Sequence, residues 1–326
     1  MKYPVTILSG FLGSGKTTLL NQILKTADGL RIAVMINDFG DVNIDKDLVV
    51  GQSGDVLELS GGCMCCTIRE DLLTSAKDLL ANGRAFDYLI VETSGLAEPG
   101  SVAQTFLTPG LEESFRLDAV VTVVDSANIG TWLAQNLTAT EQIRAADLLV
   151  INKLDLVTSE EADRVKSRLE KINDRARTLP SINGAVPVKL LLDIDVHQAP
   201  HNEDHDHDDE YHHHHDHAPH EQVYSVSFAD DIELDYDKFD RFVQSLPDAV
   251  YRAKGTVAIQ GLNRRVIFHR VGARNVLDQG ELWGGESRSC RAVLLGRDFD
   301  GDQLLARLRD CAVTSCDSTV RRGAVN

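Results

Sequence analysis

VTILSGFLGSGKTTLL, residues 5–20, decides the fold of this chain. The apolar run 5–9 predicts a strand, and the pattern from Lys16 to Lys25 predicts a helix. The turn between them fits G-x-x-x-x-G-K-[ST], in which glycines let backbone N–H groups point inward at a phosphate and the helix N-terminus adds positive potential. Lys16 is expected to contact the β- and γ-phosphates, and the Thr17 hydroxyl to bind Mg²⁺. The nucleotide-binding residues predicted here are Gly10, Gly13, Ser14, Gly15, Lys16, Thr17 and Thr18.

Strands and helices alternate through the first half of the sequence. Further apolar, β-rich runs occur at residues 32–36, 88–92, 119–125 and 148–152, and helix-like stretches at Glu70–Leu80 and Ser159–Lys171. Continuous apolar strands separated by helices are typical of parallel sheets covered on both faces. We therefore expect an α/β fold with a doubly wound, mostly parallel sheet of the P-loop NTPase type.

A segment rich in histidine and acid divides the chain. Ten of the eleven histidines lie between His197 and His220, together with seven carboxylates and almost no large apolar residue, so the segment is expected to be disordered. Beyond it, β-rich runs (VYSVSF, TVAIQ, RVIFH, RAVLLG) and helices near 236–245 and 301–311 predict a small α+β C-terminal domain with an antiparallel sheet. The expected divisions are a nucleotide-binding domain (1–192), a linker (193–221), a C-terminal domain (222–313) and a tail (314–326).

The base of the nucleotide is indicated by Asn152-Lys153-Leu154-Asp155 at the end of the run LLVIN. An aspartate there can accept hydrogen bonds from N1–H and the N2 amino group of guanine, which adenine does not offer in that arrangement. Asn152, Lys153 and Asp155 are therefore expected to bind GTP. The alternative is an ordinary turn at a strand end, where Asn and Asp are common.

The third nucleotide element is Glu92-Thr-Ser-Gly95, at the end of the run YLIVE. Glu92 is expected to hold Mg²⁺ through water, and the Gly95 N–H to sense the γ-phosphate and drive a switch. Lys16, Glu92 and Gly95 form the expected catalytic set. Most GTPases have aspartate at the Glu92 position, and no glutamine is evident to orient water, so slow intrinsic hydrolysis is expected. Asp125 is interpreted as a helix cap rather than a metal ligand.

A second, softer metal site is indicated by Cys63-Met-Cys65-Cys66. Two or three thiolates suit Zn²⁺, Cu⁺ or similar ions, and a helix starting near residues 68–71 would lower the thiol pKa values. The alternative is a buried cysteine cluster. Asp38 and Asp41 follow the run 32–36, where a GTPase has its first switch loop, and are candidate ligands of the same metal. They could equally be solvated loop carboxylates.

Composition excludes several classes of protein. Fifty acidic and thirty-three basic side chains give a net charge of −17, which argues against nucleic-acid or anionic-membrane partners. No apolar run reaches the length of a membrane span, and the N-terminus does not read as a signal peptide. Six cysteines are too few for a disulfide scaffold in a chain of this length. A cytoplasmic location is expected.

GFLGSGKTT, NDFGDVNID, GGCMCC, VETSG and NKLD, in this order, resemble the CobW family of metallochaperone GTPases. The resemblance extends over the chain, because the family also carries a His-rich linker and a small C-terminal domain, and YRAKG at 251–255 is similar to a signature of that domain. It implies a GTP-gated metal site in which Cys65 is the central thiol. Family members often have glutamates where this chain has Asp38 and Asp41, which places the metal geometry in doubt.

The function expected is a GTP-dependent chaperone that binds a divalent metal, zinc first and cobalt next, and delivers it to a client metalloprotein on hydrolysis. Its cofactors would be GTP, Mg²⁺ and Zn²⁺ or Co²⁺, and a GTP-dependent dimer stays an open alternative. The weak auxiliary ligands expected in the linker are His205, His207, His212, His213, His214, His215 and His217. The alternatives are a metal store with a vestigial GTPase, a dedicated activator for cobalamin synthesis or nitrile hydratase, a P-loop small-molecule kinase, and a linker that only solubilises.

Overall fold

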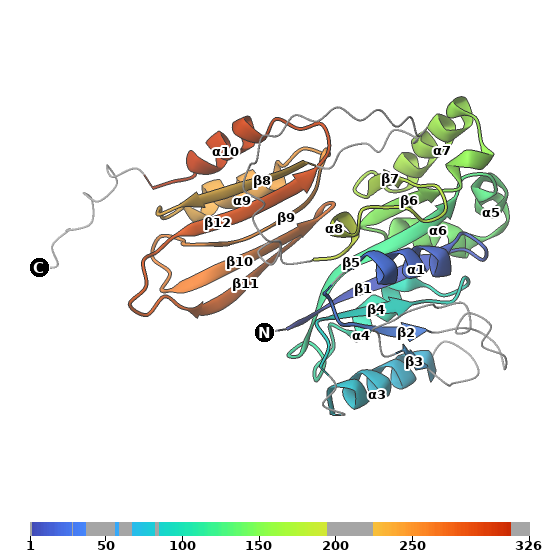
Figure 1. Ribbon diagram of the computed structural model, residues 1–326, viewed down its shortest axis with the longest axis horizontal. Coiled ribbons are helices and arrows are strands. Elements are labelled where there is room, and N and C mark those ends of the chain that lie inside the picture. Colours follow the sequence, from blue (N-terminus) through green and yellow to red (C-terminus); the bar gives the residue numbers. More distant parts are fainter. Residues whose placement is uncertain are drawn as a thin grey trace, which may run out of the picture.

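The computed structural model describes residues 2–27, 29–36, 56–58, 67–81, 85–193 and 224–313. They form two sheets, one of seven strands in the first half of the chain and one of five strands in the second half (Figure 1). The expected fold class, a doubly wound parallel sheet followed by a small α+β unit, is confirmed.

The first sheet has the order β3-β2-β4-β1-β5-β6-β7, and every neighbouring pair is parallel. Its strands are β1 (Tyr3–Gly10), β2 (Ile32–Ile36), β3 (Val56–Glu58), β4 (Tyr88–Glu92), β5 (Phe115–Asp125), β6 (Leu148–Asn152) and β7 (Arg177–Pro180). Its helices are α1 (Lys16–Thr26), α3 (Thr67–Ala81), α4 (Pro99–Thr105), α5 (Ile129–Gln135), α6 (Leu137–Arg144), a 3₁₀ turn (Leu154–Leu156), α7 (Ser159–Ile172) and α8 (Val188–Leu191). Parallel strands bring their carboxyl ends to one edge, where ligands of such folds bind.

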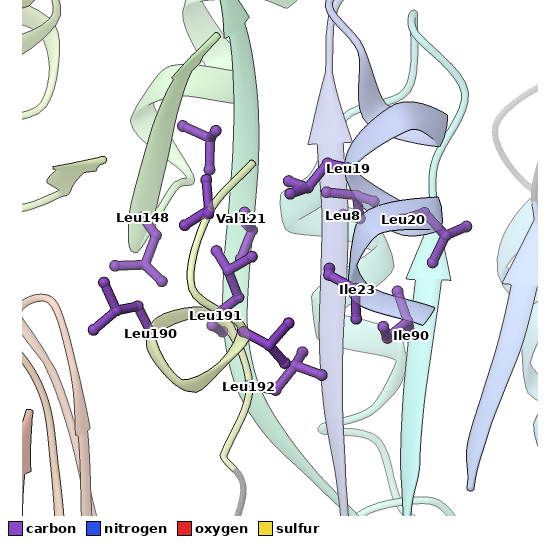
Figure 2. Close-up of a cluster of buried hydrophobic side chains, with 14 of the residues drawn as sticks. Leu8, Leu19, Leu20, Ile23, Ile90, Val121, Leu148, Leu190, Leu191 and Leu192 are labelled. Atoms are coloured by element: carbon purple, nitrogen blue, oxygen red, sulfur yellow. The ribbon is translucent and has the colours of Figure 1, made fainter. Parts of the chain in front are cut away.

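Alternation along the central strands sends side chains to opposite faces. Leu8 packs with Leu19 and Leu20 of α1, whereas Ile7 packs with α3 and α4 on the other face. Figure 2 shows the α1 side of the sheet, where Leu190, Leu191 and Leu192 from the α8 segment lie beside Leu148 and Val121. Apolar side chains on both faces explain why these strands read as continuous apolar runs.

The second sheet is antiparallel, with the order β11-β10-β9-β12-β8. It consists of β8 (Tyr224–Asp230), β9 (Val250–Val257), β10 (Arg264–Val271), β11 (Arg274–Leu282) and β12 (Cys290–Gly296). The amphipathic helices α9 (Tyr236–Gln244) and α10 (Gly301–Arg309) cover one face through Phe239, Phe242, Leu304 and Leu308. Asp235 and Asp300 cap these helices by accepting from the N–H groups of Lys238 and Gln303.

The opposite face of the second sheet meets the first sheet through a polar cluster. Asp118 of β5 lies against Arg252 of β9, and Arg252 also donates to the carbonyl of Leu190 at 2.7 Å. Asp193, the first residue of the expected linker, lies 2.5 Å from Arg116 and 3.0 Å from Lys254. Val271, Val293 and Leu295 of the second sheet join the apolar cluster on the α1 side of the first.

Some predicted boundaries were wrong. The run expected as the strand TVAIQ lies mostly beyond β9, and the charged YRAKG run forms that strand instead. Arg252 and Lys254 can occupy a partly buried strand because Asp118 of β5 and Asp193, two residues beyond α8, pair with them. β7 and β11 were not predicted, since RTLP is short and RNVLDQGEL is an edge strand with polar side chains.

Candidate nucleotide-binding site

The loop between β1 and α1 has the backbone that phosphate binding requires. Gly10, Gly13 and Gly15 have positive φ values of 141°, 71° and 102°. α1 begins at Lys16 without a side-chain cap and without an acidic residue in its first turn. Its first N–H groups and the helix dipole are therefore directed at the loop, where an anion would satisfy them.

Two of these glycines are also required by close packing. A Cβ on Gly10 would lie 2.4 Å from the carbonyl oxygen of Val123, and one on Gly15 would lie 2.4 Å from Nδ2 of Asn152. Any side chain at either position would displace the loop from β5 or from Asn152. The glycines of the motif therefore allow the loop to pack closely against β5 and Asn152, in addition to allowing its backbone conformation.

The residues expected to hold Mg²⁺ are brought together. The Thr17 hydroxyl donates a 2.9 Å hydrogen bond to Oε1 of Glu92, which is 2% exposed at the end of β4. Lys16 begins the same turn of helix and is 9% exposed. Mg²⁺ prefers hard oxygen ligands of this kind, so the donor set fits the ion.

Hydroxyl groups around this loop are consistent with a polar ligand. Within the described part of the chain, the buried hydroxyls of Ser9, Ser14 and Ser94 have no hydrogen-bond partner. Buried polar groups in native proteins are nearly always satisfied, and a bound nucleotide with its water would supply partners here.

Gly95 lies in a turn directly against the phosphate loop. A Cβ on Gly95 would lie 2.7 Å from the backbone nitrogen of Leu12. The chain enters this turn from Thr93, whose N–H donates to the carbonyl of Leu8 at 2.9 Å, and the turn is closed by a 3.1 Å bond from Ala97 N–H to the Ser94 carbonyl. The residue expected to sense the γ-phosphate is thus next to the loop expected to bind it.

Asn152 connects three parts of the candidate base pocket. Its Nδ2 donates to the carbonyl of Ser14 at 3.0 Å, and its Oδ1 accepts from the Gly184 N–H at 3.1 Å. The side chain is 2% exposed. Asn152 therefore acts by tying the phosphate loop to the loop that follows β7.

Lys153 is held by a partner that sequence reasoning missed. It has a left-handed backbone (φ 62°), and its Nζ lies 2.7 Å from Oδ2 of Asp125, which is 1% exposed. Burial alone would raise the pKa of Asp125, but hydrogen bonds from Lys153 and Asn128 hold that pKa below its ordinary value. Oδ1 of Asp125 also accepts from the N–H groups of Ala127 and Asn128 in the turn before α5. The N-cap of α5 is Asn128, without a side-chain cap, so the interpretation of Asp125 as a helix cap was wrong.

The loop 181–185, which was also not predicted, lies beside Asn152 and the 3₁₀ turn that carries Asp155. Ser181 N–H donates to the Ile151 carbonyl at 2.9 Å, and Leu154 N–H donates back to the Ser181 carbonyl at 3.3 Å. Gly184 packs against α1, because a Cβ there would lie 2.9 Å from Cα of Leu19. The only sequence signal was Asn183-Gly184, a common turn pair. Asp155, in the adjoining 3₁₀ turn, is exposed.

The candidate transported-metal ligands lie outside the described residues. These are Asp38, Asp41, Cys63, Cys65, Cys66 and the linker histidines His205, His207, His212, His213, His214, His215 and His217. Across the described ranges no group of three or more His, Cys, Asp or Glu residues could hold a metal, and no helix is long and apolar enough to cross a membrane.

The two described cysteines are unlike metal ligands. Cys290 and Cys311 are buried free thiols in the core of the second sheet. Burial raises the pKa of Cys290 to about 11, so this thiol stays neutral at physiological pH. Neither thiol belongs to a group of three or more possible metal ligands in the described part of the chain, so neither marks a metal site there.

Comparison with known proteins gives two family matches. The model for the CobW/HypB/UreG nucleotide-binding domain matches residues 4–180, and that for the cobalamin synthesis protein cobW C-terminal domain matches residues 223–312.

The chain is similar to "Zinc chaperone CobW" of Sinorhizobium sp, with 32% identity over 92% of this chain and 94% of that protein. It is 40% identical to "Zinc-regulated GTPase metalloprotein activator 1" of Dictyostelium discoideum over 59% of this chain, a match that spans 48% of that relative. The solved structure of Zn(II)-bound YjiA GTPase from E. coli is 26% identical, covering 96% of this chain and 100% of that chain with a TM-score of 0.46.

Proposed function

We propose that this chain, which belongs to the CobW/HypB/UreG family and is a GTPase, is a zinc chaperone whose metal site is coupled to its nucleotide site. The similarity to a protein named as a zinc chaperone extends over nearly the whole of both chains. Zinc is the first metal expected and cobalt the next, because thiolate and imidazole ligands suit both.

The observation that carries the proposal is the register at the carboxyl edge of the first sheet. Ile36, the last described residue before Asp38, pairs with Glu92, and Glu58, the last described residue before the cysteine motif, pairs with Ile36. Two residues of chain span at most about 7 Å, and adjacent strands lie about 4.8 Å apart. Asp38 therefore follows a strand that ends at the same edge of the sheet as Glu92, the candidate Mg²⁺ ligand.

A helix follows the cysteine motif directly in the sequence. α3 begins at Thr67, directly after Cys66. A helix N-terminus stabilises a nearby thiolate, so metal binding by Cys63, Cys65 and Cys66 is favoured at this point of the chain. Ordering of these segments by GTP and Mg²⁺ would then assemble the thiolates with Asp38 and Asp41 around one ion.

The geometry of the first sheet supports the nucleotide roles proposed for its residues. Lys16 and the loop N–H groups would hold the phosphates, and Thr17 and Glu92 would hold Mg²⁺, which neutralises charge developing on the γ-phosphate. Asp155 would accept from guanine, with Lys153 held in place by Asp125. The client would be a cytoplasmic apoprotein that accepts the metal after hydrolysis.

Reciprocal linkage provides the test. If GTP tightens the metal site, zinc must tighten GTP by the same factor, for which about 5–150-fold is usual. GTP titrations with and without saturating Zn²⁺ should show this gain in the wild type and lose most of it in Cys65→Ala. Metal-free GTP affinity should be almost unchanged in that variant.

A matched control separates the motif from other thiols. Cys311→Ala removes a buried cysteine in the second sheet and should leave the zinc effect on GTP intact. A wild-type protein whose GTP affinity ignores zinc would refute the coupled mechanism. Light scattering of the same samples tests whether GTP binding produces a dimer.

A further inference from the structure

Gln142 of α6 is a buried side chain that contacts the Gly95 turn. It is 1% exposed, and its Nε2 donates to the carbonyl of Gly95 and to the carbonyl of Ala97, both at 3.1 Å. An amide NH₂ carries two hydrogens, so one side chain satisfies both carbonyls. No sequence pattern marks this residue, which lies 47 positions from Gly95.

The same residue is fixed at its backbone. The carbonyl of Gln142 accepts a 2.9 Å hydrogen bond from the Thr122 hydroxyl on β5. Since β5 lies beside β1, the strand that leads into the phosphate loop, α6 is anchored to the rigid part of the sheet. Gln142 therefore connects the 94–97 turn, which has no regular secondary structure, to a helix that is itself hydrogen-bonded to β5.

The turn has little freedom left once Gln142 is in place. Ser94 and Ala97 close it by a backbone hydrogen bond, and Gly95 lies so close to Leu12 that no Cβ fits. The N–H of Gly95 makes no hydrogen bond with another described residue, whereas the carbonyl of the same residue is held by Gln142. The N–H of Gly95 shares a planar peptide unit with the Ser94 carbonyl, which accepts from the Ala97 N–H, so the closed turn sets the direction of that N–H. Gln142 holds this turn in place through the carbonyls of Gly95 and Ala97.

We propose that Gln142 is a positioning residue for GTP: it holds the 94–97 turn against the phosphate loop so that the Gly95 N–H is directed at the γ-phosphate before GTP binds. A donor that is already oriented binds the γ-phosphate without the cost of ordering the turn. The inference rests on the proposed role of Gly95 in the GTPase. It requires neither zinc nor the cysteine motif.

The selective readout is the preference for GTP over GDP, because only GTP carries the γ-phosphate. Affinities for GDP and for a non-hydrolysable GTP analogue are measured by calorimetry with Mg²⁺ and without zinc, on the full chain. Gln142→Met removes both donors but keeps the length of the side chain, and Gln142→Glu keeps the shape but replaces the NH₂ by oxygen. Both should lower the analogue-to-GDP affinity ratio about tenfold, the effect of losing one hydrogen bond of ordinary strength, with GDP affinity nearly unchanged.

Asn173, which follows α7, offers a matched control because it holds the same helix without contacting the 94–97 turn. It is also a buried amide, and its Nδ2 donates to the carbonyls of Ile143, Arg144 and Ala146 at the C-terminal end of α6. Asn173→Asp keeps the acceptor for Arg175 and Ala176 but removes the donor. This variant should be destabilised like the Gln142 variants, yet keep the wild-type affinity ratio.

The outcomes separate the inference from its premise. A folded Gln142→Met with the wild-type ratio, or an equal loss in Asn173→Asp, overturns the role of Gln142. A wild-type protein that binds GDP and the analogue equally removes the role of Gly95, and the inference with it. Hydrogen exchange on the wild type needs no variant: the Ala97 amide should be protected without nucleotide, and protection that appears only with the analogue refutes a turn held in advance.

Discussion

Arg252 and Asp118 form a two-pronged ion pair between the two sheets, with Nη1–Oδ1 at 3.0 Å and Nη2–Oδ2 at 2.9 Å. The side chains are 6% and 1% exposed. Asp118 also accepts from the Tyr88 hydroxyl, and burial together with the Asp118 charge holds the pKa of Tyr88 well above its ordinary value, so Tyr88 remains a neutral donor. Buried charges of this kind are stable only while each keeps its partner, because removing one partner leaves the other charge uncompensated.

Arg252→Met should therefore be strongly destabilising, by about 3–5 kcal/mol, because buried Asp118 loses its two-pronged partner and keeps only Arg116, at 3.6 Å. Urea unfolding followed by fluorescence measures the loss. Arg291→Met, on the neighbouring β12 and exposed, should stay within about 0.5 kcal/mol of wild type. The double variant Asp118→Asn with Arg252→Met should regain part of the stability, and an additive double variant would contradict the pairing.

Asp193 should make the folded state sensitive to acid. Burial alone would raise its pKa, but the His269 hydrogen bond and the charges of Lys254, His269 and Arg116 together hold that pKa well below its ordinary value. A carboxyl whose pKa is lower when folded adds stability above its unfolded pKa of about 3.9, and this contribution is lost as the pH falls through the folded pKa. The stability gap between wild type and Asp193→Asn should be full at pH 6 and shrink below pH 4, in acid unfolding curves. Asp174→Asn, at an exposed position, should show no such gap.

Asp155→Asn should alter base preference without affecting folding, because Asp155 is exposed beside the candidate base pocket. Losing the carboxylate acceptor should weaken GTP by about 10–150-fold, the range for hydrogen bonds to a charged group, and admit xanthosine triphosphate. Competition binding with both nucleotides measures this. Asp163→Asn on α7 is the control, and an unchanged guanine preference would reduce the 152–155 motif to a turn.

Deleting residues 200–219 should leave GTP turnover nearly unchanged and lower the number of weakly bound zinc ions at pH 7. Near pH 5 the difference should vanish, because protonated imidazoles do not bind metal. Calorimetric titration of both proteins at both pH values measures the stoichiometry. Equal stoichiometry at pH 7 would make the segment a spacer. Several weak ions without any GTP-dependent site would instead favour a metal store.

Much of this fold could be predicted from patterns of neighbouring residues in the sequence. The phosphate loop and the strand before the 152–155 motif could be predicted because glycine spacing and apolar runs are encoded in adjacent residues. Asp125 and Gln142 could not, since their importance comes from partners far away in the sequence. The strand containing Arg252 was missed for the same reason: its charges look exposed until the opposing sheet is known.

The apolar contact behind the polar cluster has a thermodynamic consequence. Figure 2 shows Leu190, Leu191 and Leu192 beside the first sheet. Val293 and Leu295 of β12 belong to the same buried cluster, so the second sheet completes the core of the first. Cutting the chain after the first sheet would leave part of this cluster facing water, at about 25 cal/mol for each Å² uncovered. We therefore expect the two sheets to melt as one cooperative unit, with a single calorimetric transition, and a fragment that ends at residue 193 to aggregate rather than report on the activity of the intact chain.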